Sequence, residues 1–263
     1  MNDRLRKFLS ILPWVAASSA VASTPATIPV DEEAFWQQVY DSRTAYYEKY
    51  IGQFPDDILK MGNMTGVWPG GGLFVIQADK LGKDLWVYTT FGMTNPDMPA
   101  STMMADYKIE TDDQGRASKY SGTLQNKERV QSTGGATGYG YEMVLITKEN
   151  AEWPLWFMQW SANAEILNDA GILDRVEKYQ GLTVQDIQVG ESESVNVLIA
   201  KAQHPLPTGI DLPNGKMDLL IATVITDDEM QWSIENGREV LLAKLIKSGV
   251  GQVSDRSRKS ILK

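Results

Sequence analysis

The run from Leu85 to Pro96 constrains the fold of this chain more than any other part of the sequence. Residues 85–91 read Leu-Trp-Val-Tyr-Thr-Thr-Phe, an unbroken series of apolar, aromatic and β-branched residues. Such a series is typical of a mostly buried strand. The segment Gly92-Met93-Thr94 follows at once, and Asn95-Pro96 then turns the chain. The sequence therefore predicts a buried strand that ends abruptly in a turned segment.

The other segments form groups of helices and strands without a fixed repeat. An apolar face at spacings of three and four predicts a helix capped by Asp31 and closing at Gly52. A capping box of Thr226 and Glu229 predicts a last helix that continues through Gly237 to Gly249. We also expect a helix at 162–178 and strands at 73–76, 103–110, 141–147, 154–160, 195–202 and 219–226. This order favours an α+β fold, a mixed sheet with flanking helices, over a regularly alternating sheet.

Residues 111–140 differ in composition from these segments. They are rich in Gly, Ser and Thr and carry mixed charges. A stretch of this length without secondary structure is unusual inside a compact domain unless it is functional or mobile. We therefore expect a long functional or mobile loop here.

Composition and charge exclude several classes of function. With 43% hydrophobic and 22% charged residues, the chain has the composition of a globular protein. A formal charge of −9 argues against nucleic acid, which is bound largely through Lys and Arg on phosphate groups. The same charge fits a basic protein partner or a protein that is merely soluble. The chain has no cysteine, which removes disulfides, zinc–thiolate sites and thiol catalysis. We expect no cofactor.

Residues 1–30 do not resemble the rest of the chain. A basic start precedes an apolar run, and Ala20-Val21-Ala22 has the small-x-small pattern that signal peptidase recognises. The run is too short for a stable membrane anchor, which needs about 20 apolar residues. We interpret 1–22 as a candidate signal peptide, 23–30 as a linker and 31–263 as the folded domain. An amphipathic helix or a disordered tail is the alternative for the first segment. Cleavage would place the protein in the periplasm or outside the cell, and an intact terminus would leave it cytoplasmic.

Few residues could carry catalysis. The only histidine, His204, precedes a proline in a predicted surface loop, and one His without Cys cannot build a typical zinc site. The Gly-rich runs at 70–72 and 134–140 match no phosphate-binding pattern. The acidic pairs Asp112-Asp113 and Asp227-Asp228 fit a turn and a helix cap. Two carboxylates sharing one cleft at about 5–10 Å could still form a metal-independent hydrolase. We keep that hydrolase as the alternative to a non-enzymatic protein.

Aromatic residues gather at 153–160. In the strand expected there, Trp156, Met158 and Trp160 would share one side and Phe157 would take the other. Packing of both sides in the core is one interpretation. The alternative is a partly exposed aromatic patch that binds a partner.

Several segments resemble the suppressor of fused family, in the family's order. Residues 46–52 resemble its opening helix, and Leu85 through Thr94 resembles its strand ending in Thr-x-Gly-Met-Ser, with Thr94 in the serine place. Tyr141-Glu142-Met143-Val144-Leu145 is similar to its aromatic-Glu-Leu strand. Thr226-x-x-Glu229 and Asp255-Arg256-Ser257-Arg258 match its closing pattern.

The resemblance implies a mixed α/β fold and a non-enzymatic, protein-binding function. Animal members sequester transcription factors through a groove that accepts an extended peptide, and bacterial members are commonly proposed to be immunity proteins that neutralise toxins. We expect the partner here to be a toxin or an extended peptide segment. We also expect Gly92, Met93, Thr94 and Glu142 to form one partner-binding cleft, although Met93 could equally fill the core.

Overall fold

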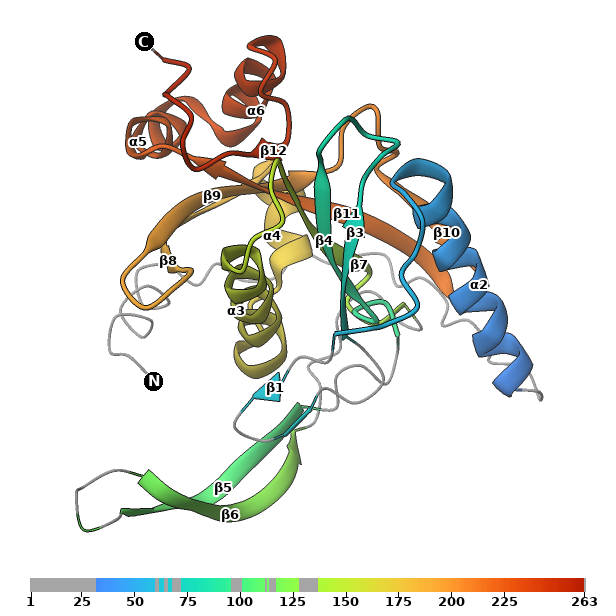
Figure 1. Cartoon of the computed structure of the whole chain (residues 1–263), viewed down its shortest axis with the longest axis vertical. Helices are drawn as coiled ribbons and strands as arrows, with labels where there is room; N and C mark the ends of the chain where they lie inside the picture. The colour runs from blue at the N-terminus through green and yellow to red at the C-terminus, as the bar shows by residue number, and fades with distance from the viewer. Residues whose placement is uncertain are drawn as a thin grey trace.

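An eight-stranded mixed sheet lies at the centre of the protein, shown by a computed structural model (Figure 1). The structure describes residues 32–59, 62–63, 66–67, 72–95, 101–111, 113, 117–127 and 137–262. The strands of the sheet are β3 (Gly72–Gln77), β4 (Trp86–Phe91), β7 (Tyr141–Thr147), β8 (Leu182–Gln188), β9 (Ser194–Lys201), β10 (Gly209–Leu212), β11 (Gly215–Ile225) and β12 (Val253–Ser254).

The order of the sheet is β3-β4-β7-β11-β9-β8, with β10 paired to β11 and β12 paired to β7. The central strands β7 and β11 run parallel, whereas β4 and β7, and β11 and β9, run antiparallel. Strands of both directions in one sheet, with helices that do not alternate regularly with them, define an α+β fold. The predicted fold class is confirmed.

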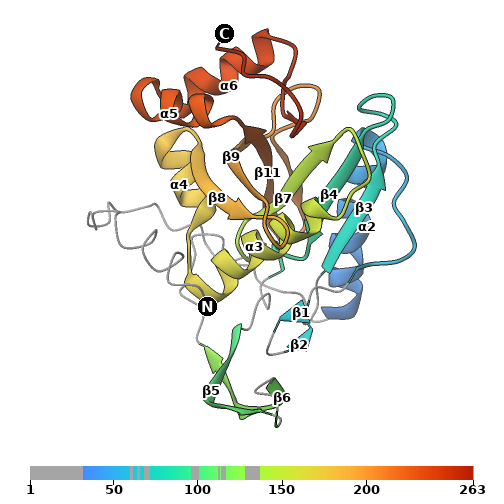
Figure 2. The ribbon, with the colours of Figure 1, turned by 60° about the vertical axis from the view of Figure 1, so that its left-hand side comes forward.

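Helices cover both faces of the sheet (Figures 1 and 2). Helix α2 (Glu32–Tyr50) shares a buried cluster with Val144 and Ile146 of β7. Helices α3 (Trp153–Asn168) and α4 (Ile172–Tyr179) share a second buried cluster with Met143 and Leu145 of the same strand. These four residues of β7 alternate along the strand, so the two clusters lie on opposite faces. A third cluster joins α5 (Asp227–Asn236) and α6 (Arg238–Lys247) to β9.

The strand expected at 154–160 is wrong, because these residues lie in α3. Pro154 lies in the first turn of the helix, where its missing N–H breaks no hydrogen bond. Phe157 and Met158 are fully buried, while Trp156 is 49% exposed. Adjacent buried residues fit the core-facing stripe of a helix and do not fit a half-buried strand. The two interpretations of the aromatic cluster each hold for one residue: Phe157 packs in the core, and Trp156 is partly exposed.

Two predicted helices are each divided in two. The helix expected at 162–178 is interrupted after Asn168, where Asp169 and Gly171 take left-handed backbone conformations with φ of 49° and 59°. The last helix is interrupted at Gly237, whose φ of 97° is incompatible with a continuous helix. Glycine readily adopts positive φ, and Gly237 ends α5 inside the segment where one continuous helix was expected. Strand β8, which the sequence analysis did not expect, follows α4 directly.

The stretch 111–140 is not a continuous loop. It contains β6 (Ala117–Lys127), which pairs with β5 (Ser101–Thr111) in a separate two-stranded antiparallel sheet. Figures 1 and 2 show this hairpin, which we call the arm, projecting away from the central sheet. Two shorter strands, β1 (Gly62–Asn63) and β2 (Gly66–Val67), form another small ribbon.

The N-terminal predictions fall on residues outside the described ranges, so the signal peptide, the linker and the cap at Asp31 stay predictions. The predicted helix beginning near Glu32 is present as α2, and His204 lies exposed in a loop as expected. None of the helices described by the structure is long and apolar enough to cross a membrane.

Thr226 begins α5 with the predicted capping box, and its backbone N–H donates to Oε2 of Glu229 at 3.0 Å. We expect Thr226→Ala to lower the free energy of unfolding by about 1 kcal/mol, because it leaves a helix N–H without its side-chain acceptor. Urea unfolding of wild type, Thr226→Ala and Thr226→Ser measures the effect. Serine keeps the hydroxyl, so equal losses in both variants would contradict a capping role.

Candidate functional site

A buried polar cluster surrounds Glu142 of β7. We call it the Glu142 cluster, and its members are Arg43, Thr90, Gly92, Met93, Thr94, Asn95 and Glu142. Oε1 of Glu142 accepts hydrogen bonds from the N–H groups of Gly92 (3.0 Å) and Thr94 (3.2 Å) and from the Thr94 hydroxyl (2.8 Å). Oε2 accepts from the Thr90 hydroxyl (2.7 Å) and the Met93 N–H (3.3 Å). The turn after β4 therefore folds around a single carboxylate.

Arg43 brings a positive charge from α2 to the same cluster. Its Nη1 lies 3.6 Å from Oε1 of Glu142, and its Nη2 donates to Oδ1 of Asn95 at 2.7 Å. Both charged side chains are 0% exposed. The guanidinium also lies over the Phe91 ring, 4.6 Å from its centroid. Because two ions have lost their hydration here, each depends on the other for compensation. The cluster thus ties α2 to the end of β4.

The structure brings the four predicted cleft residues together. Gly92, Met93, Thr94 and Glu142 are in direct contact, and Gly92 makes the turn with a φ of 124°. All four are buried, and Met93 is 1% exposed within the hydrophobic core. They therefore do not line an open cleft, and Met93 occupies the core position that the sequence left as the alternative. Their role in partner binding stays a prediction.

The Glu142 cluster also holds the chain on both sides of the arm. The Tyr139 N–H donates to the Met93 carbonyl at 2.8 Å, and Nδ2 of Asn214 donates to the Thr94 carbonyl at 2.9 Å. Gly138 has a φ of 64°, and a Cβ there would lie 2.3 Å from the Asn95 carbonyl oxygen. Segments 92–95 and 137–140, which precede β5 and follow β6, are therefore fixed against each other.

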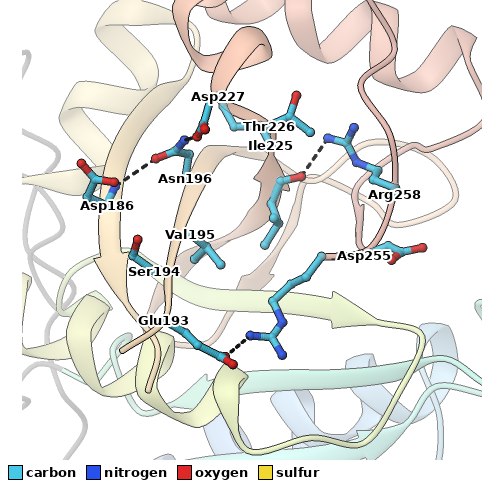
Figure 3. Close-up of a pocket in the computed structure, with 12 residues that line it drawn as sticks. Asp186, Glu193, Ser194, Val195, Asn196, Ile225, Thr226, Asp227, Asp255 and Arg258 are labelled. Carbon is cyan, nitrogen blue, oxygen red and sulfur yellow. Dashed lines mark hydrogen bonds and ion pairs between the residues drawn. The ribbon is translucent and has the colours of Figure 1, made fainter. Parts of the chain in front are cut away.

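An open pocket lies elsewhere, between the β8–β9 hairpin, the end of β11 and the C-terminal segment (Figure 3). Its volume is about 430 Å³. We call it the C-terminal pocket, and its lining residues include Asp186, Glu193, Asn196, Asp227, Asp255, Arg256 and Arg258. The floor contains the apolar residues Val195 and Ile225. The sequence did not indicate this pocket, although two segments of its wall belong to the closing pattern of the suppressor of fused resemblance.

Polar side chains fix the wall formed by β8, β9 and α5. Oδ1 of Asn196 accepts from the Asp186 N–H at 2.9 Å, and Nδ2 of Asn196 donates to Oδ1 of Asp227 at 2.8 Å. Asp186 has a φ of 55°, which marks the irregularity in the pairing of β8 with β9. Asn196 thus links the residues Asp186 and Asp227, whose side chains are exposed at the rim of the pocket.

The opposite wall is held by two ion pairs of very different exposure. Arg258 is 9% exposed, and its Nη2 contacts Oε2 of the fully buried Glu229 at 2.5 Å. The same Nη2 donates to the Val224 carbonyl at 3.0 Å. Arg256 pairs with Glu193, and these side chains are 34% and 59% exposed. The buried pair secures the C-terminal segment on α5, while the exposed pair joins that segment to Glu193, just before β9.

Two carboxyl groups, one in the pocket and one in the core, have shifted pKa values. A hydrogen bond from the Ser257 hydroxyl, followed by one from Lys148, lowers the pKa of Asp255 to about 2. Burial raises the pKa of Glu165, but that side chain is 4% exposed in the core and accepts from the Ile172 N–H at 3.0 Å. Among the described residues, no group of three or more His, Asp or Glu side chains could hold a metal ion.

These features define an α+β domain with a buried polar cluster and a surface pocket beside its C-terminal segment. A family model described as suppressor of fused protein (SUFU) matches residues 71–259. The chain therefore belongs to the suppressor of fused family, and the resemblance seen in the sequence is confirmed. A comparison with curated protein sequences finds no significant match.

Solved structures from the same family resemble this chain at low sequence identity. A protein described as a SUFU homolog from Neisseria gonorrhoeae is 15% identical, with a TM-score of 0.49, over 87% of this chain and 97% of that one. Drosophila Suppressor of Fused is 14% identical, with a TM-score of 0.47, over 87% of this chain and 51% of that one. The matched chain in a Sufu–Fu complex is 16% identical, with a TM-score of 0.44, over 87% and 92% of the two chains.

Proposed function

We propose that this chain is a non-enzymatic protein-binding domain that acts as an immunity protein by neutralising a toxin. Membership of the suppressor of fused family carries the proposal. One of the solved structures is that of a Sufu–Fu complex, so binding of a protein partner has a precedent in that protein. The buried character of the Glu142 cluster supports a structural role for its charges and gives no support to a catalytic one.

The C-terminal pocket suits the basic surface of such a partner. Four carboxylates and two guanidinium groups line it, and both guanidinium groups already pair with carboxylates of this chain. Asp186 and Asp227 remain exposed at the rim. A partner that places Lys or Arg between them would gain attraction and a faster association rate at low ionic strength. The chain's formal charge of −9 also attracts a basic partner and raises its association rate.

The test uses the protein encoded beside this chain's gene as the candidate toxin. We expect co-expression with wild type to restore growth of cells that express the toxin, and the two proteins to be purified together. Asp186→Asn should weaken the complex because it removes one rim charge at a backbone position that Asn also tolerates. Glu48→Gln, an exposed change on α2, is the matched control. No complex with a neighbouring or native-host protein would refute the proposed function.

The compartment follows from the N-terminus. We propose that the protein works in the periplasm or outside the cell after cleavage near Ser23, with a cytoplasmic location as the alternative. The apolar run and the small-x-small pattern before Ser23 support export. N-terminal sequencing of protein from native cells decides between them. A first residue at or near Ser23 supports export, and an intact Met1 supports the cytoplasmic alternative.

A further inference from the structure

The C-terminal pocket contains two carboxylates that the described part of the chain does not neutralise. Two of its four acidic side chains, Glu193 and Asp255, each pair with a basic residue of this chain. Both guanidinium groups of the lining are bound to carboxylates as well. Within the residues that the structure describes, neither Asp186 nor Asp227 has an ion partner. The wall formed by β8, β9 and α5 therefore carries a surplus of negative charge.

The two unpaired acidic residues are held in a fixed relation to each other. The buried side-chain amide of Asn196 accepts from the Asp186 N–H at 2.9 Å and donates to Oδ1 of Asp227 at 2.8 Å. A single side-chain amide thus spans the gap between the two residues. A cation that binds here meets a wall whose backbone is already ordered, which lowers the entropic cost of binding.

The size and the floor of the pocket restrict what it admits. Its volume of about 430 Å³ lies within the range of about 300–1,000 Å³ that is typical of sites for small molecules. Such a space suits a projecting side chain and is too small for a helix. Val195 and Ile225 line it together with the acidic wall (Figure 3). Apolar groups beside unpaired carboxylates suit a side chain that has an aliphatic stem and a cationic head.

We propose that the C-terminal pocket binds a single arginine side chain that projects from the partner protein. Its stem packs on Val195 and Ile225, and its guanidinium contacts the carboxylates of Asp186 and Asp227. Arginine suits these groups better than lysine, because its planar guanidinium forks toward more than one acceptor and is more weakly hydrated than an ammonium group.

The proposal rests on the proposed protein-binding function and specifies the contact that recognises the partner. The long-range attraction of the acidic rim acts on any basic surface. Insertion of a side chain into the pocket, by contrast, requires both a positive charge and a stem of suitable length. Binding in the pocket should therefore discriminate between peptides that differ in one side chain.

Short synthetic peptides and the isotope-labelled full chain provide the test. The probe is acetyl-Gly-Ser-Arg-Ser-Gly-amide, and its counterparts carry lysine, citrulline or norleucine in place of arginine. Citrulline keeps the shape of arginine without its charge. Backbone amide chemical shifts in NMR titrations should change at Asp186, Asn196 and Asp227. We expect the citrulline peptide to bind about tenfold more weakly than the arginine peptide, as the loss of two exposed ion pairs implies. The lysine peptide should have an intermediate affinity, and the norleucine peptide should bind as weakly as citrulline.

Neutral variants of the pocket wall give an independent measurement. Asp186→Asn keeps a residue type that tolerates the φ of 55° at this position, and Asp227→Asn keeps an oxygen that can accept from Asn196. Each should weaken binding of the arginine peptide about two- to fivefold and leave that of the citrulline peptide unchanged. The matched control for the double variant is Glu48→Gln/Glu191→Gln, which removes two exposed charges outside the pocket. Unchanged melting temperatures would show that the variants are folded.

Several results would overturn the proposal. They are equal affinities of the arginine peptide and either the lysine or the citrulline peptide, chemical shift changes confined to other parts of the chain, and equal losses in the pocket variants and the control. No binding of the arginine peptide at millimolar concentration would do the same.

The double variant Asp186→Asn/Asp227→Asn distinguishes this proposal from the proposed function. If a protein partner binds the double variant as tightly as wild type, the C-terminal pocket is not the contact, while the protein-binding function stands. If no protein partner exists but the peptides behave as expected, the pocket is an arginine-binding site and the immunity function fails.

Discussion

Replacing Glu142 by Ala is expected to lower the free energy of unfolding by about 3–5 kcal/mol, because it leaves Arg43 buried without its ion partner. The same change removes the acceptor of five hydrogen bonds from Thr90, Gly92, Met93 and Thr94. Buried donors that lose their acceptor pay the full cost of desolvation. A loss of this size would consume a large part of the stability of a typical domain. Equilibrium unfolding in urea measures it.

The double variant Arg43→Met/Glu142→Gln provides the control. It removes both charges together, so it avoids the unpaired buried ion that either single change creates. We expect a smaller loss of stability than the sum of the two single variants, Arg43→Met and Glu142→Gln. Additive losses would mean that Arg43 and Glu142 do not interact energetically, which would contradict the cluster. A loss below about 1 kcal/mol for Glu142→Ala would do the same.

The central strands could be predicted from the sequence, and so could the turn that follows β4 and belongs to the Glu142 cluster. Residues 85–91 are a continuous run of apolar, aromatic and β-branched residues, and 141–147 are such a run except for Glu142. Runs of this kind indicate a buried strand. The proximity of Gly92-Met93-Thr94 to Glu142 came from the family resemblance. The place of Arg43 in the Glu142 cluster was not predicted. Its burial depends on where α2 packs on the sheet, and no local sequence pattern indicates that placement.

The errors also have physical causes. Residues 153–160 are apolar and aromatic throughout, and such a short run does not distinguish a strand from a buried helix. The proline at 154 was the available signal for a helix start. Strand β6 is rich in Ser and Thr and contains Gly122, so its composition indicated a loop. Its pairing with β5 supplies the order that its own side-chain pattern does not.

The C-terminal pocket was missed because it is assembled from distant parts of the chain. Asp186 and Asn196 come from neighbouring strands, and Asp227 begins α5. Thr226-x-x-Glu229 was assigned to helix capping, and the Asp255–Arg258 segment had no assigned contact. The structure joins these two segments through the Arg258–Glu229 pair. A capping glutamate followed some thirty residues later by an arginine could have indicated this long-range contact, but sequence spacing alone does not fix it.

Arg258→Ala is expected to lower the free energy of unfolding by about 3–5 kcal/mol at neutral pH, because it leaves the buried Glu229 carboxylate without its cation. Arg256→Ala is the matched control from the same segment. The Arg256–Glu193 pair is largely exposed, so its removal should cost about 0–1 kcal/mol. Urea unfolding of the three proteins measures both losses, and similar losses in the two variants would contradict the assignment of Arg258 as the residue that secures the C-terminal segment.

The pH dependence of the same variants gives a second and independent test. Burial raises the pKa of Glu229, but the hydrogen bonds from Arg258 and from the Ile261 and Thr226 N–H groups outweigh it and lower the pKa below 4.5. A folded-state pKa below the unfolded value stabilises the protein above the unfolded pKa, and this stability is lost as the pH falls through the folded pKa. Without Arg258, burial opposes the charged form, so the variant should gain from protonation of Glu229. The stability difference between wild type and Arg258→Ala should therefore be largest at neutral pH and shrink steadily below pH 4.5. A difference that does not change with pH would show that Arg258 stabilises the fold by packing and not by its charge on Glu229.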